Sequence, residues 1–76
     1  MDKSLLIKKF NKLVAQKNAC EIWFDEPSTT DEQRRDMTPK LLKACNEMVD
    51  IANKLAKVGY LVMQNDYFNG IKEGLE

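Results

Sequence analysis

Histidine is absent from this 76-residue sequence, which also contains only two cysteines, three glycines and two prolines. Without an imidazole, the chain has neither a Ser-His-Asp nor a Cys-His catalytic arrangement, and it lacks the usual ligand of mixed zinc sites. Cys20 and Cys45 are too few for a site with four thiolates in one chain. The scattered glycines match neither a phosphate-binding loop nor a dinucleotide fingerprint. The sequence therefore predicts no metal site, no cofactor and no nucleotide-binding enzyme.

Long apolar runs are also missing. The first run is broken at Lys8, which makes it too short for the core of a signal peptide, and no later run approaches the roughly 18 residues of a membrane span. We therefore expect a cytoplasmic protein without membrane contact, in which both cysteines are reduced and buried. The 12 basic and 12 acidic residues give a formal net charge of zero. The sequence thus lacks the positive excess typical of nucleic-acid binders, and we do not expect a nucleic-acid partner.

The short length limits the chain to one small helical domain over residues 1–76, near the size at which a single core becomes marginal. Hydrophobic residues make up 43% and charged residues 32% of the chain, which is the balance of a globular protein rather than a disordered one. At this length the free energy gained by burying apolar surface nearly cancels the conformational entropy lost on folding. Self-association or a bound partner would therefore add needed stability.

Residues 2 to 18 carry apolar side chains at helical spacing, among them Leu6, Phe10 and Val14, and predict a first helix whose lysines mostly form its solvated face. Residues 20–24 either continue this helix, which the pattern slightly favours, or form a strand. Pro27 ends either structure, because a proline disfavours the helical conformation of the residue before it. We therefore expect a loop over residues 25–29.

Two start signals follow the loop. Thr29 or Thr30 can cap a short polar helix through about Asp36, and Thr30 with Gln33 has the spacing of a capping box. Thr38 followed by Pro39 predicts the start of a second main helix, because a hydroxyl suits the N-cap and a proline suits the first helical position. Gly59 is its expected end. A third main helix is predicted near the C-terminus from the four-residue spacing of the apolar side chains Tyr67, Ile71 and Leu75.

The predicted fold class is all-α, a small bundle of three main helices plus one short polar helix. The alternative is an α+β fold with a minimal two-stranded pairing of residues 20–24 and 60–63. Met48 and Leu55 are expected in the core, because they belong to an apolar stripe spaced by four and three residues along the second helix. That stripe is broader than one short neighbour requires, which also predicts a homodimer.

Paired carboxylates are the remaining catalytic option, at residues 25–26 and 31–32. We interpret them as solvated surface, because acidic side chains are rarely buried and neighbouring residues point in different directions. The chain is therefore predicted not to be an enzyme. The favoured function is a non-enzymatic protein-binding or regulatory module that acts through a protein–protein interface. The alternative is a small DNA-binding regulator of helix-turn-helix type, formed by residues 30–36 and 39–58.

The acidic segment between Glu21 and Asp36 is the candidate partner-binding surface. It holds the only tryptophan and six of the 12 acidic residues. Tryptophan is enriched in binding hot spots, and acidic rim residues speed the encounter with a basic partner, although a lone tryptophan in a small domain is also a common core residue. The predicted partner is another protein, with a basic surface. The predicted contact residues are Trp23, Phe24, Asp25, Glu26, Asp31 and Glu32.

Overall fold

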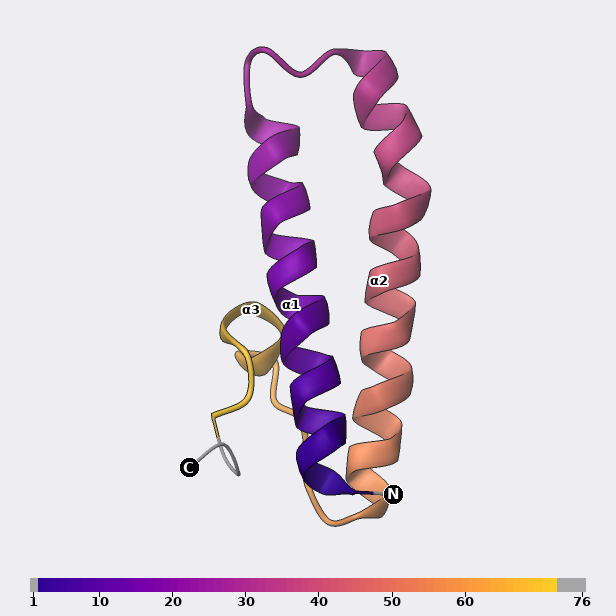
Figure 1. Ribbon diagram of the computed structural model, residues 1–76, viewed down its shortest axis with the longest axis vertical. Helices are drawn as coiled ribbons and strands as arrows, with labels where there is room; N and C mark the ends of the chain where they lie inside the picture. Colours follow the sequence, from indigo (N-terminus) through magenta and orange to yellow (C-terminus); the bar gives the residue numbers. More distant parts are fainter. Residues whose placement is uncertain (1, 73–76) are drawn as a thin grey trace.

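Two long antiparallel helices form a hairpin, and a short third helix packs beside one half of it (Figure 1). The computed structural model describes residues 2–72, with α1 at Lys3–Asp25, α2 at Asp31–Lys57 and α3 at Asp66–Asn69. The molecule is a rod of 42 × 21 × 18 Å. We call the end that carries the connection over residues 26–30 the turn end, and the opposite end the base.

The prediction of an all-helical chain is confirmed for residues 2–72, which contain no strand. The favoured continuation of the first helix through residues 20–24 is confirmed, and the alternative pairing of this segment with residues 60–63 is wrong, because the second segment is irregular. Cys20 and Phe24 explain why the helix continues. They extend the stripe of Leu13 at spacings of seven and four residues, and both are half-buried, so helical backbone keeps them beside the rest of the apolar face.

A separate polar helix does not exist, because α2 runs without interruption from Asp31 and contains Pro39 in its interior. The capping box is confirmed: Thr30 Oγ1 accepts from the Gln33 amide at 3.2 Å, and Gln33 Oε1 accepts from the Thr30 amide at 2.9 Å. The hydroxyl of Thr38 donates to Arg34 O at 2.8 Å instead of capping a new helix. An interior proline costs about 3 kcal/mol.

The apolar stripe of α2 offsets this cost. Met37, Leu41 and Ala44 are half-buried at spacings of four and three residues, so an unbroken helix keeps all three on the face that meets α1. The helix-start signal at Thr38 and Pro39 is therefore outweighed by the capping box at Thr30 and by the apolar stripe of α2. One consequence is that the backbone stays helical between residues 36 and 39, with no interhelical turn there.

The predicted third main helix is reduced to the four residues of α3. Gly70 ends it with φ of 82°, a left-handed conformation that favours glycine. Gly59, with φ of 91°, follows the end of α2 as predicted. Ile71 is buried although it lies beyond the helix, and Leu75 lies outside the described residues.

The core fills the base half of the rod. Met48 and Leu55 are 1% and 0% exposed, which confirms their predicted burial. No apolar side chain of residues 18–47 is fully buried, so the turn half consists of two helices without a third layer. The fully buried apolar side chains of the described chain are Leu6, Ile7, Phe10, Val14, Met48, Ile51, Leu55 and Ile71.

Polar side chains of α1 hold the C-terminal segment in place. Asn11 Nδ2 donates to Ile71 O at 2.8 Å, and Asn11 Oδ1 accepts from the Ile71 amide at 2.6 Å. Asn18 Nδ2 donates to Phe68 O at 2.9 Å. The rings of Phe10 and Tyr67 meet edge to face with centroids 5.3 Å apart. These contacts fix α3 on the base half and direct its aromatic side chains toward the hairpin.

Candidate protein-binding surfaces

The six residues predicted to contact a partner all lie at the turn end. Trp23 and Phe24 occupy the last turn of α1, where their rings meet edge to face with centroids 5.8 Å apart. Both are half-buried, so this aromatic pair is neither a core contact nor fully accessible. The four predicted acidic residues are exposed, at positions 25, 26, 31 and 32. The structure therefore brings an aromatic pair and four carboxylates to one end of the rod.

Two residues that sequence reasoning missed organise this end. Arg34 Nε donates to Phe24 O at 2.8 Å, its Nη2 donates to Glu26 O at 3.3 Å, and its Nη1 lies 3.1 Å from Asp31 Oδ1. Thr29 is buried, and its hydroxyl donates to Trp23 O at 2.7 Å. The last carbonyls of a helix need such donors. The predicted loop is thus present as the connection over residues 26–30, one residue later than expected, and hydrogen bonds from Thr29 and Arg34 fasten it to the end of α1.

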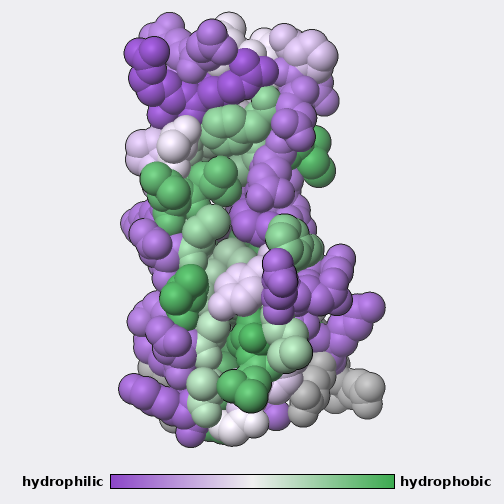
Figure 2. Space-filling view, turned by 180° about the vertical axis from the view of Figure 1, so that it is seen from behind, coloured by the Kyte–Doolittle hydropathy of each residue, from purple (hydrophilic) through white to green (hydrophobic). Residues whose placement is uncertain are grey.

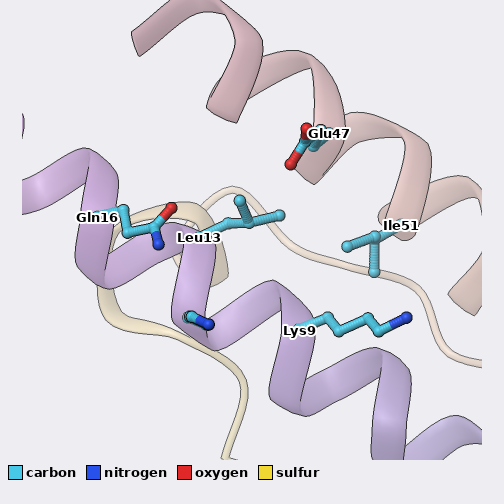
Figure 3. Close-up of a pocket in the computed structure, with 6 residues that line it drawn as sticks. Lys9, Leu13, Gln16, Glu47 and Ile51 are labelled. Atoms are coloured by element: carbon cyan, nitrogen blue, oxygen red, sulfur yellow. The ribbon is translucent and has the colours of Figure 1, made fainter. Parts of the chain in front are cut away.

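A first groove between α1 and α2 has an apolar floor and a basic rim. Figure 3 shows Leu13 reaching from α1 into the space between the helices, with Ile51 of α2 opposite and Lys9 beside it. Gln16 and Glu47 complete the labelled lining, and Lys40 and Lys43 line its continuation along the helices. These lysines are exposed, so water and salt screen their attraction for an acidic group.

A second groove, which we call the α3 groove, is the more apolar one. Its lining combines all three helices and consists of Lys17, Glu21, Cys45, Met48, Val49, Tyr67 and Phe68. Val49 is 51% exposed and Phe68 is 54% exposed. Figure 2 shows the rod from behind, with apolar side chains in a band along the middle of that face and hydrophilic side chains at the turn end.

Lys17 is a buried cation at this groove, only 6% exposed. Its Nζ lies 3.5 Å from Glu21 Oε1 and 4.4 Å from the centroid of the Phe68 ring. The carboxylate and the ring face both attract the ammonium group. Lys17 is therefore an exception to the predicted solvated face of lysines on the first helix, and it links α1 to α3.

The cysteines do not form a bond with each other. Cys20 and Cys45 are free thiols, and both are half-buried rather than fully buried as expected. Cys45 belongs to the α3 groove. Within residues 2–72, no group of three or more Cys, Asp or Glu side chains is arranged to hold a metal ion.

The sequence matches no family model, and comparisons with curated proteins and with solved structures give no significant match. The protein is therefore described by its fold, which is an α-helical hairpin with a short third helix beside its base half. None of the helices in the described part of the chain is long and apolar enough to cross a membrane.

Proposed function

We propose that the protein is a non-enzymatic protein-binding module that acts through the α3 groove. The observation that carries this proposal is the exposure of Val49 and Phe68 on one apolar groove, beside a hairpin half that has no third layer. Single exposed apolar side chains are ordinary, whereas a contiguous apolar surface marks an interaction site.

The stripe of α2 extends this surface toward the turn end. Leu42 is 58% exposed and stands three and seven residues before Cys45 and Val49, the spacing of one helix face. A groove between helices with anchors at this spacing suits a partner helix laid along it. Burial of the anchors would supply the affinity, at roughly 25 cal/mol per Å² of apolar surface removed from water.

The turn end supplies the second part of the proposal. Trp23 and Phe24 offer half-buried rings, and the exposed acidic residues around them favour a partner with a basic surface. The alternative of a helix-turn-helix regulator is not proposed, because α2 is one continuous helix over Asp31–Lys57, where that motif needs two helices joined by a turn.

Affinity purification with matched variants tests the proposal. The tagged chain is compared with its Val49→Lys and Leu5→Lys variants in an extract of the source cells that also contains an untagged copy. Leu5 is equally exposed, at 56%, but does not line the α3 groove. We expect the wild type and Leu5→Lys to retain a protein, either another chain or the untagged copy, and Val49→Lys to lose it. Equal retention by all three folded chains, or retention of nothing, contradicts the proposal.

A further inference from the structure

We infer that the occupant of the α3 groove is a second copy of this chain, in a two-fold symmetric dimer with antiparallel rods. The inference rests on the proposed function, because it names the partner of the same groove. A two-fold contact uses the same surface of both copies, so that surface must be complementary to itself. Shape, charge and area each meet this condition.

The shape condition follows from the position of α3. It lies beside the base half of the hairpin and leaves the turn half uncovered (Figure 1). The groove is near mid-length, since Lys17 and Cys45 stand well inside α1 and α2. A two-fold axis through the groove, perpendicular to the rod, therefore turns each base half onto the partner's turn half. Each α3 then supplies the third layer that the other copy's turn half lacks.

The same rotation pairs exposed apolar side chains. Phe68 keeps 54% of its surface exposed although its ring lies over Lys17, and Leu42 and Val49 are exposed on α2, where Val49 lines the groove. In the antiparallel arrangement, the ring of one copy approaches the exposed stripe of the other. Every such contact is made twice in a two-fold dimer.

Charge decides the orientation. The turn half, residues 18–47, contains seven acidic and four basic residues, a net charge of −3. The base half, residues 2–17 and 48–72, contains eight lysines and three aspartates, a net charge of +5. Two of these lysines, Lys54 and Lys57, lie in the last turn of α2. Antiparallel rods place opposite charges together at both ends, whereas parallel rods place like charges together, which costs affinity.

The area condition separates aligned rods from crossed rods. A stable interface buries about 800 Å² on each partner. The broad face of the rod is 42 × 21 Å, so aligned rods overlap over a projected area of about 880 Å², which is enough for an interface of this size. Rods crossed at right angles would share only about 440 Å². Antiparallel overlap along the full length is thus the arrangement that meets all three conditions.

Sedimentation equilibrium of the full chain over a wide concentration range tests the dimer. We expect the wild type and the Leu5→Lys control to dimerise, and Val49→Lys to raise the dimer Kd about 100-fold, because a roughly tenfold loss occurs in each of the two copies. Circular dichroism verifies that each variant folds. Leu42→Lys replaces Val49→Lys if the latter does not fold, since Leu42 is exposed on the same stripe.

A distance between two spin labels tests the orientation. The label is attached through Ser28→Cys at the turn end, in a chain in which the free thiols are removed by Cys20→Ser and Cys45→Ala. Because Cys45 lines the α3 groove, sedimentation equilibrium of this chain first verifies that it dimerises like the wild type. Antiparallel rods separate the two labels by about the 42 Å length of the rod, whereas parallel rods stacked on the same broad face separate them by about its 18 Å thickness. We expect the longer separation.

Three results overturn the inference: a monomer at millimolar concentration, a label separation near the 18 Å thickness of the rod, or a folded Val49→Lys variant that dimerises like the wild type. A monomeric chain that still retains a different protein through Val49 overturns only the dimer and leaves the proposed function standing. A monomeric chain that retains no protein overturns both.

Discussion

The amide side chain of Asn11 should be the main polar anchor of the C-terminal segment. It makes two hydrogen bonds with the backbone of Ile71, at 2.8 and 2.6 Å, in a partly buried setting. Asn11→Ala removes both bonds and leaves the amide and the carbonyl of Ile71 without these partners. At about 1 kcal/mol for each bond, the free energy of unfolding should fall by about 2 kcal/mol. For a domain of this size, the melting temperature should fall by about 8 to 16 °C.

Thermal unfolding followed by far-ultraviolet circular dichroism measures this loss, at one fixed protein concentration because association raises the melting temperature. Asn18→Ala is the matched control. It makes the same substitution on α1 but removes a single, exposed hydrogen bond to Phe68 O. We expect the control to lose less than half as much stability. If Asn11→Ala melts at the same temperature as Asn18→Ala, the two bonds of Asn11 do not hold the segment, and the account of how α3 is fixed is wrong.

Three further variants test the fold and the turn end. Leu55→Asp places a carboxylate where the native side chain is 0% exposed, so circular dichroism should show an unfolded chain; a melt within a few degrees of wild type would contradict the core assignment. Thr30→Ala removes the hydroxyl of the capping box and should cost about 1 kcal/mol in urea unfolding, whereas Ser28→Ala, outside the box, should cost nothing measurable. Trp23→Ala should remain folded, because the ring is only half-buried, and should dissociate faster from a basic partner in surface plasmon resonance, with about 2 kcal/mol less binding free energy; an unfolded variant or unchanged binding would remove Trp23 from the site.

Local patterns predicted much of the hairpin. The capping box at Thr30 and the glycine that follows α2 depend on interactions within a few residues, and both are present. The stripe that buries Met48 and Leu55 depends only on helical periodicity. The prediction of where α2 starts was wrong, because the sequence contains two valid start signals. The helix that is capped by Thr30 tolerates Pro39 in its interior, since its apolar stripe continues past the proline.

The third helix could not be predicted from local pattern. Tyr67, Ile71 and Leu75 have helical spacing, yet the Ile71 side chain is buried in the core formed with α1 and α2, and its backbone is hydrogen-bonded to Asn11, 60 residues away in the sequence. The left-handed Gly70 turns the chain toward that contact and ends α3. A contact of such long range leaves no trace in the spacing of nearby residues, so helix and turn were indistinguishable there.

The candidate site shows the same limit. Composition directed attention to Trp23, the largest aromatic side chain among acidic residues, and the structure places it at the turn end. The α3 groove was missed because Lys17, Val49 and Phe68 come from three separate helices. In the sequence, Lys17 resembled a solvated lysine, and Phe68 resembled a side chain of the predicted third main helix. Only their assembly around one groove distinguishes them.

The central claim is that the α3 groove is the surface through which this chain binds protein, and nuclear magnetic resonance of the isotope-labelled chain tests it most directly. Backbone amide signals are recorded while the protein concentration is raised from micromolar to millimolar. The account predicts that the signals of Cys45, Val49 and Phe68 shift with concentration. The signals of Lys9 and Leu13, which line the first groove between α1 and α2, should stay in place. Shifts confined to Lys9 and Leu13 would contradict it. So would α3-groove signals that stay in place at every concentration and after addition of a protein retained in the affinity experiment.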